Sequence, residues 1–246
     1  MKIVVIGGSG QIGSKLVTKL GEQGHEAVPA SPSTDVNTLT GAGLAEVLAG
    51  ASVVIDVSNL RSVEASALLD FFETSSRNLL AAESEAGVGH HVVLSVVGAD
   101  RLPDSGYFRA KVAQEKLVGG SSIPSTIVRA TQFFEFIGRI ADAATVDGVM
   151  LVPPALVQPI AADDVVAALV RISLGDPNVK IEVGGPEQFT FEQLLRQHAD
   201  ATGDSRELVV DPHARYFGTE LAERSLLPGE GATLSDTTYA DWLKTP

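Results

Sequence analysis

The chain has 246 residues, 31 of them acidic and 18 basic, which gives a formal net charge of −13. That length suits one α/β domain with a small appendage, and a hydrophobic share of 44% excludes disorder as the main state. The acidic balance argues against nucleic acid and anionic membranes as partners, because phosphate binding needs clustered Lys and Arg. The sequence has no cysteine, which excludes disulfides, thiolate metal sites and cysteine nucleophiles.

The apolar run at the N-terminus ends at Gly7, which is too early for the core of a signal peptide. No apolar stretch reaches the roughly 18 residues that a membrane span requires. We therefore expect a soluble, cytoplasmic protein that acts on a small-molecule substrate. A homodimer is expected only by analogy with related folds.

Short β-branched runs alternate with amphipathic stretches through the first two-thirds of the chain, a pattern typical of βαβ units in a parallel sheet. The predicted strands are Ile3–Ile6, Glu26–Ala30, Ser52–Val57, His91–Val97 and Ser125–Arg129. Helices are predicted between them, around Ile12–Leu20, Leu44–Leu48, Leu68–Glu85 and Ala110–Leu117. Beyond Arg129 the rhythm loosens, and only three more elements are clear. These are a helix over Asp163–Ile172, a strand over Lys180–Val183 and a helix over Phe191–Thr202.

A glycine-rich loop follows the first strand and precedes the first helix. Gly8–Gly13 reads G-x-G-x-x-G, and in this context the motif predicts that backbone N–H groups bind a dinucleotide pyrophosphate. The alternative is a glycine-rich turn that has only a structural role and binds no ligand. The expected cofactor-binding residues of the loop are Gly7, Gly8, Ser9, Gly10, Gln11, Ile12 and Gly13.

The end of the second strand bears on the choice of nucleotide. It carries hydroxyls at Ser31, Ser33 and Thr34, where an NAD-selecting carboxylate would otherwise stand. These hydroxyls, with Lys15 in the first helix, favour NADP(H) through its 2′-phosphate. NAD(H) stays open, because the loop has no arginine and Asp35 follows closely.

Tyr107 and Lys111 form a Y-x-x-x-K pair, one helical turn apart after the fourth strand. A neighbouring ammonium is expected to lower the tyrosine pKa towards the range useful for general acid–base catalysis. Ser95, on the preceding strand, is the candidate for holding a substrate carbonyl. The alternatives are a partly exposed tyrosine beside a solvated lysine, and a buried serine bonded to backbone.

Several segments together resemble an atypical short-chain dehydrogenase/reductase of the NmrA-like, NAD(P)-binding group. The resemblance covers most of residues 1–210, in order. It rests on Gly7–Gly13, Leu94–Asp100, Ile127–Glu135, Pro159–Val165 and Val183–Glu187. It implies a Rossmann-type, doubly wound parallel sheet with a small C-terminal substrate-binding portion. We accordingly divide the chain at 1–155, the NAD(P)-binding core, and 156–246, which completes the sheet and covers the substrate within one structural unit.

The resemblance also implies roles for particular residues. Tyr107 would give or take a proton, Lys111 would bind the nicotinamide ribose, and Ser95 would orient the substrate. Further cofactor contacts are expected at Val57, Ser58, Ala130, Thr131, Gln132 and Phe133. Candidate substrate contacts are Phe133, Phe134, Phe136 and Tyr216, although the phenylalanines could equally be core.

An aromatic segment near the C-terminus and a pair of adjacent histidines also bear on the site. Tyr216–Gly218 is either a lid over the substrate or simply packing of the C-terminal arm. His90 and His91 do not indicate a metal site, because adjacent strand residues face opposite ways and no further ligands cluster nearby. We expect no metal.

Three functions are consistent with the sequence. The favoured one is an NAD(P)-dependent oxidoreductase that transfers a hydride to or from a carbonyl, enone or quinone of a small hydrophobic compound. The second is a non-catalytic dinucleotide sensor of the NmrA-like kind, since many members of that group lack the tyrosine. The third is an NAD(P)-dependent epimerase or dehydratase.

Overall fold

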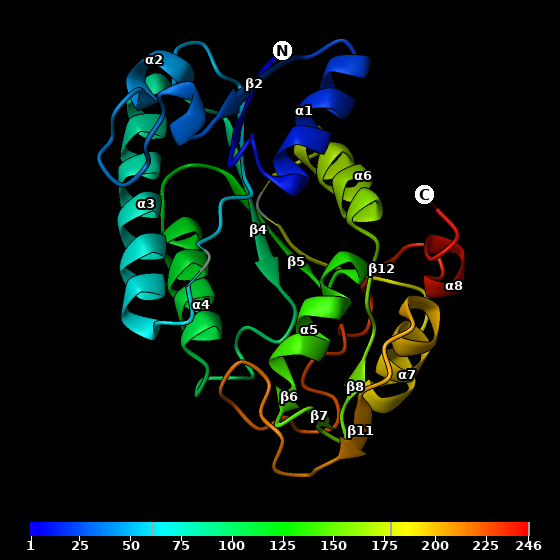
Figure 1. Ribbon diagram of the computed structural model, residues 1–246. Coiled ribbons are helices and arrows are strands. Elements are labelled where there is room, and N and C mark those ends of the chain that lie inside the picture. The colour runs from blue at the N-terminus through cyan, green and yellow to red at the C-terminus, as the bar shows by residue number, and fades with distance from the viewer. Residues whose placement is uncertain (61, 178, 246) are drawn as a thin grey trace.

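A seven-stranded parallel sheet forms the centre of the computed structural model, which describes residues 1–60, 62–177 and 179–245 (Figure 1). In space the strands follow the order β12-β9-β5-β4-β3-β1-β2. Their bounds are β1 Lys2–Ile6, β2 Glu26–Ala30, β3 Val53–Asp56, β4 His90–Val96, β5 Ser125–Ala130, β9 Val179–Gly184 and β12 Thr233–Leu234. Strands β1 and β3 each contain a buried apolar run, Ile3–Ile6 and Val53–Ile55, because helices cover both faces of the sheet.

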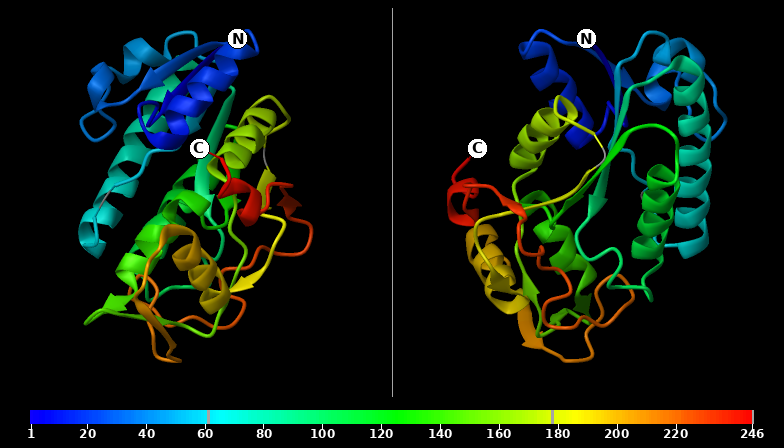
Figure 2. Two further views of the ribbon diagram at one scale, coloured as in Figure 1. Left: turned by 45° about the vertical axis from the view of Figure 1, so that its right-hand side comes forward. Right: turned by 180° about the vertical axis from the view of Figure 1, so that it is seen from behind.

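Two layers of helices enclose the sheet (Figures 1 and 2). Helices α1 (Gln11–Glu22) and α6 (Ala162–Ser173) pack together on one face. Helices α2 (Leu44–Leu48), α3 (Ala65–Ala86) and α4 (Gly106–Gly119) cover the other. The predicted doubly wound, Rossmann-type α/β fold is confirmed.

The winding of the sheet reverses beside β1. From β1 the chain passes to β2 at the edge, and then returns across β1 to β3, so β1 lies between the two. In sheets of this kind, ligands bind at the carboxyl ends of the strands next to such a reversal. The loop that leaves β1 at this point is the predicted glycine loop.

Beyond the carboxyl ends of the strands lies a second lobe with its own apolar core, seen in the lower part of Figure 1. Its core side chains include Phe134, Met150, Phe191 and Tyr239, so residues on both sides of position 155 contribute to it. Its elements are η2 Phe134–Phe136, α5 Ile137–Ala143, β6 Thr145–Val146, β7 Val149–Val152, β8 Leu156–Val157, β10 Phe189–Thr190, α7 Phe191–Thr202, β11 Glu207–Val210 and α8 Tyr239–Trp242.

Helix α4 differs most from its sequence-based expectation, because it begins at Gly106 rather than near Ala110. This start is fixed by tertiary packing: a Cβ on Gly106 would lie 2.4 Å from the Cβ of Ala65, at the start of α3. The earlier start places Tyr107 in the first turn of the helix.

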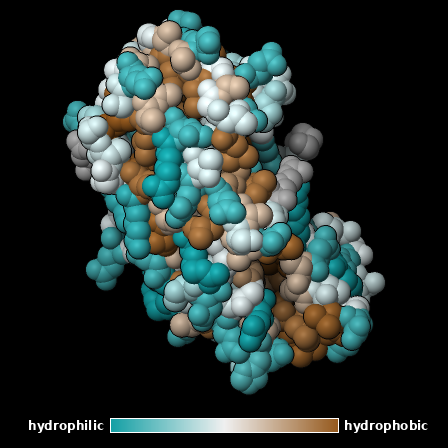
Figure 3. All heavy atoms as spheres, turned by 90° about the vertical axis from the view of Figure 1, so that its left-hand side faces the viewer, coloured by the Kyte–Doolittle hydropathy of each residue, from teal (hydrophilic) through white to brown (hydrophobic). Residues whose placement is uncertain are grey.

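The face that carries α3 shows hydrophobic atoms in small groups among hydrophilic ones, with the clearest group towards the lower end of the molecule (Figure 3). Within residues 1–60, 62–177 and 179–245, no helix is both long enough and apolar enough to cross a membrane.

Candidate active site

The glycine loop is so tightly packed that three of its positions have no room for a side chain. A Cβ on Gly8 would lie 2.6 Å from Pro29, and one on Gly13 would lie 2.2 Å from the carbonyl oxygen of Gly7. Gly7 itself has a φ of +77°, which favours glycine. Helix α1 starts immediately after this loop, with Gly10 as an N-cap that offers no side-chain hydrogen bond. The loop therefore presents bare backbone and a helix N-terminus to a ligand.

Buried polar groups that have no hydrogen-bond partner of regular geometry within the described part of the chain lie at the neighbouring strand ends. They are the hydroxyls of Ser58 and Thr131 and both amide atoms of Gln132. Ser58 follows β3 beside the glycine loop, where a Cβ on Gly7 would lie 3.0 Å from its Cα. Buried polar atoms without hydrogen bonds are costly, so these groups suit a polar ligand that satisfies them. Together with the cradle, these residues fit a dinucleotide.

The residues expected to select the nucleotide are largely engaged with one another. The Ser31 and Ser33 hydroxyl oxygens are 2.9 Å apart, and the Ser31 N–H donates to the Thr34 hydroxyl at 2.9 Å. The Lys15 ammonium lies 2.5 Å from a carboxylate oxygen of Asp163 on α6. These contacts give no support to the preference for NADP(H).

Lys111 is buried, and its amine points to the protein interior. It donates to the carbonyl oxygen of Leu94 at 2.8 Å and to the side-chain oxygen of Gln114, and it lies 4.5 Å from the centre of the Phe72 ring. Gln114 in turn donates to Asp56 at 3.0 Å. Burial lowers the pKa of Lys111 to about 8, although the charges of Asp56 and Glu115 oppose that shift.

The expected effect of Lys111 on Tyr107 is wrong for this structure. Burial raises the pKa of Tyr107 to about 12, and the opposing influence is the side chain of Asn59, not the lysine. The physical reason is the direction of the ammonium, which is bonded to Leu94 and Gln114. Asn59, which follows β3, is a site residue that the sequence analysis missed.

The Ser95 hydroxyl is engaged within the protein. It donates to a carboxylate oxygen of Glu115 on α4 at 2.6 Å, within a buried network that includes Arg129. Its hydroxyl is therefore already used in binding another part of the protein. The role implied for it by the resemblance stays a prediction.

A cavity of about 460 Å³ opens beside Tyr107. Its walls come from the first turns of α3 and α4, from α5 and β7, and from the segment 215–218. Tyr216, Arg109, Arg215 and Phe217 line it. The role of Tyr216 as a substrate contact stays a prediction. The cluster of aromatic residues at 216–217 was the only sequence signal for this wall.

The three phenylalanines that were expected as substrate contacts do not line this cavity. Phe134 is buried and packs on Tyr239 and Trp242, with ring centres 5.0 and 5.6 Å away. Phe133 and Phe136 stack on each other at 5.4 Å. The core interpretation therefore accounts for Phe134.

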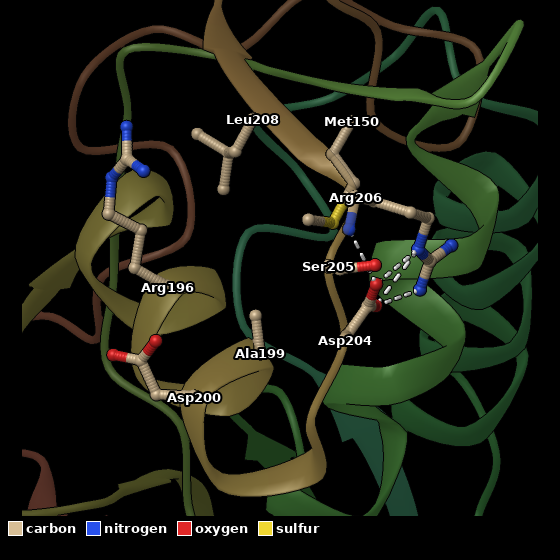
Figure 4. A pocket seen from close by; sticks show the side chains of 8 residues that line it. All are labelled: Met150, Arg196, Ala199, Asp200, Asp204, Ser205, Arg206 and Leu208. Atoms are coloured by element: carbon tan, nitrogen blue, oxygen red, sulfur yellow. Dashed lines mark hydrogen bonds and ion pairs between the residues drawn. The ribbon is translucent and has the colours of Figure 1, made fainter.

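A second, smaller pocket of about 200 Å³ lies between α7 and β11 (Figure 4). Its charged side chains are largely paired. Arg206 bonds to Asp204 at 2.9 Å, and Arg196 bonds to Glu192 on the same helix at 2.9 Å. This pocket contains none of the predicted site residues.

No family model and no curated protein matches the sequence. Solved structures do match its fold. A dTDP-glucose 4,6-dehydratase from Streptomyces venezuelae with NAD bound has a TM-score of 0.76 at 16% identity, over 100% of this chain and 95% of that one. The chain has the short-chain dehydrogenase/reductase fold. A protein of that superfamily from Agrobacterium tumefaciens with bound NAD gives a TM-score of 0.74 at 18% identity, over 99% of this chain and 95% of that one.

A third structure, described as a nucleoside-diphosphate-sugar epimerase from Staphylococcus aureus, has a TM-score of 0.75 at 13% identity and covers 100% of both chains. The short-chain dehydrogenase/reductase fold is thus shared along the whole chain. None of the three descriptions mentions the NmrA-like group, so that narrower resemblance stays a prediction.

Proposed function

We propose that the protein is an NAD(P)-dependent oxidoreductase that transfers a hydride to or from the carbonyl carbon of a small, largely apolar substrate. The observation that carries the proposal is the position of Tyr107. Its side chain lines the 460 Å³ cavity. The glycine cradle and the polar groups of Ser58, Thr131 and Gln132 follow the carboxyl ends of β1, β3 and β5 in the same fold.

When bound, the nicotinamide cofactor would supply or accept the hydride. The protein residues that would hold it are the glycine loop, the N-terminus of α1 and the polar groups after β3 and β5. The contacts at Ser31–Thr34 and Lys15 favour neither nucleotide, and NAD is the cofactor in the descriptions of the matching structures. We therefore propose NAD(P), with the choice between the two left to measurement.

Tyr107 is proposed as the proton donor to the carbonyl oxygen in the reducing direction. The raised pKa leaves the phenol protonated at neutral pH, so it holds the proton that the reduction requires. Lys111 lies one helical turn away, with its ammonium bonded to Leu94 and Gln114. Asn59 orients the tyrosine hydroxyl.

An epimerase or dehydratase is the second candidate. It is favoured by the descriptions of the structures with this fold, which include a sugar-nucleotide dehydratase and a sugar-nucleotide epimerase. Such enzymes would oxidise and re-reduce the same substrate, so they would show no net consumption of reduced cofactor.

The test begins with calorimetric titration of the purified protein with NADPH, NADP, NADH and NAD. Binding of at least one pair is expected, followed by steady oxidation of the reduced form with a carbonyl or quinone probe. Tyr107→Phe should lower kcat about 10²- to 10⁴-fold with little change in cofactor affinity. Cofactor binding without turnover of any probe would instead favour the sensor or the epimerase, and no binding would overturn the proposal.

A further inference from the structure

The active site needs a group to hold the substrate oxygen, and Ser95 is poorly placed for it. Ser95 has one hydroxyl proton, which is donated to Glu115 at 2.6 Å. Glu115 is fixed in turn by two hydrogen bonds from Arg129, of 2.8 and 2.7 Å. If Ser95 donated its proton to a substrate instead, the buried carboxylate of Glu115 would lose one of its hydrogen-bond donors. The hydrogen-bond donor to the substrate must come from elsewhere.

Tyr216 lies on the cavity wall together with Tyr107. Its ring is packed among aromatic neighbours, with ring centres 6.4 Å from Phe108, 5.6 Å from Phe191 and 4.7 Å from Phe217. Phe217 also contacts Tyr107, at 6.1 Å. One aromatic side chain therefore touches both tyrosines, which places the two phenol rings around the same space.

A tight turn holds Tyr216 in this position. The Tyr216 N–H donates to the carbonyl oxygen of Thr219 at 2.8 Å, and the Thr219 N–H donates back at 3.2 Å. The two central residues, Phe217 and Gly218, have φ angles of +47° and +84°. Positive φ is strained for a bulky residue, and such strain is found mainly where the surrounding structure and function require it.

The Tyr216 side chain interacts with the carboxamide of Gln132. The Gln132 carboxamide approaches it closely enough to oppose the rise in the Tyr216 pKa that burial and Tyr107 cause. Gln132 is 7% exposed, and among residues 1–60, 62–177 and 179–245 neither of its amide atoms has a hydrogen-bond partner of regular geometry. A buried amide at the carboxyl end of β5, beside a protonated phenol, indicates a place for a ligand oxygen.

We propose that Tyr216 donates a hydrogen bond to the carbonyl oxygen that receives the proton of Tyr107, in the role that the resemblance gives to Ser95. Gln132 acts as a positioning residue for the Tyr216 hydroxyl. In the reducing direction the O–H bond of Tyr107 breaks and the product O–H bond forms, while Tyr216 keeps its proton throughout. This inference rests on the proposed oxidoreductase function, and it assigns the second hydroxyl to the C-terminal segment.

The first experiment compares the parent with Tyr216→Phe, using para-nitrobenzaldehyde and menadione as probes and the reduced cofactor that binds best. Loss of one donor to a developing oxyanion predicts a fall in kcat of about 10²- to 10³-fold. The thermal midpoint and the cofactor affinity should stay near the parent values. The matched control is Tyr239→Phe, whose hydroxyl bonds to His198 at 2.8 Å in the second lobe. It should keep its kcat.

A second readout does not depend on turnover. Binding of para-nitrobenzaldehyde to protein loaded with oxidised cofactor, in which no hydride can move, should weaken about three- to tenfold in Tyr216→Phe because one hydrogen bond is lost. Gln132→Met removes both amide atoms at similar volume and should weaken this binding less. If Tyr216→Phe fails to fold, Gln132→Met replaces it as the test variant in this binding measurement.

The outcomes separate the two proposals. In one outcome the parent turns over the probe and Tyr107→Phe does not, while Tyr216→Phe behaves like the parent and Ser95→Ala loses activity. The assignment of Tyr216 is then overturned, and the oxidoreductase proposal stands. If the parent binds no nicotinamide nucleotide, both are overturned. The assignment of Tyr216 is supported if Tyr216→Phe loses both kcat and aldehyde binding while the control Tyr239→Phe keeps both.

Discussion

The guanidinium of Arg129 on β5 forms two hydrogen bonds with the carboxylate of Glu115 on α4, at 2.8 and 2.7 Å, and both side chains are almost fully buried. Burial alone would raise the pKa of Glu115, but the hydrogen bonds from Arg129 and Ser95 hold it below its ordinary value. This pair joins the sheet to the helix that carries Tyr107 and Lys111. The position of the proposed acid therefore depends on an ion pair outside the cavity.

Removing one member of this pair should be costly. Arg129→Met leaves the Glu115 carboxylate buried without its main partner, so we expect a loss of about 3–5 kcal/mol in the free energy of unfolding, measured in urea. The control is Arg196→Met, which breaks an exposed pair with Glu192 at 2.9 Å and should change stability by at most about 1 kcal/mol. Equal losses in both variants would contradict this account.

Two glycines of α1 should respond in opposite ways to alanine. In Gly13→Ala the new Cβ would lie 2.2 Å from the carbonyl oxygen of Gly7, so the loop must shift and dinucleotide affinity should fall at least tenfold. Gly21→Ala meets nothing within 4 Å, and it should stabilise the helix by about 0.5–1 kcal/mol. Calorimetric titration and thermal unfolding measure the two effects. Unchanged affinity in Gly13→Ala would disprove the cradle.

His91 should make stability depend on pH. Burial would lower its pKa, but the charge and hydrogen bond of Glu83, with a smaller contribution from Asp56, raise it above the ordinary 6.5. Its folded state thus prefers the protonated form. The resulting stabilisation is complete below pH 6.5 and is lost as the pH rises through the folded pKa.

Unfolding in urea at a series of pH values above neutral checks this expectation, with Glu83→Gln as the variant in which the decline should flatten. His90 does not interfere, because burial lowers its pKa and its contribution changes below 6.5. A parent protein whose stability is constant between pH 6.5 and about 8, below the range in which deprotonation of Lys111 adds stability, would refute the prediction.

Lys111 should produce an alkaline limb in the rate profile. With a pKa of about 8, its ammonium loses its proton at mildly alkaline pH, and the buried positive charge that is bonded to Leu94 and Gln114 on the helix of Tyr107 is lost with it. We expect kcat/KM to decline with an apparent pKa of about 8. Lys111→Arg, which stays charged, should lose this limb even if its maximal rate is lower. A limb that persists there must belong to another group.

Local patterns predicted the sheet and its flanking helices well. The helix over Phe191–Thr202 was placed to the residue, because its capping box and apolar periodicity are local signals. The strands β6, β8 and β12 were missed, since each has only two residues. Strands β8 and β12 exist only through pairing with distant segments, and β6 pairs with β7 in a short hairpin. The start of α4 was predicted too late. Its first residue, Gly106, packs against Ala65 of α3, a contact between segments distant in sequence.

The candidate site was predicted less evenly. The glycines of the G-x-G-x-x-G motif predicted a tight turn between a strand and a helix, and the structure has this turn between β1 and α1. The direction of the Lys111 amine was not predictable from its spacing to Tyr107, because it is set by Leu94 and Gln114. Likewise, Ser95 shows no sequence sign of its bond to Glu115, a residue 20 positions away on another element.

The division of the cavity walls has an evolutionary consequence. Tyr107, Lys111 and the glycine loop all lie within the first 111 residues, whereas the facing wall is built from α5, β7 and the turn at Tyr216. Substitutions in that wall can reshape the space for a substrate while the cradle and the acid stay intact. A lineage carrying this fold can therefore acquire new substrates one wall residue at a time, without passing through a form that has lost its cofactor.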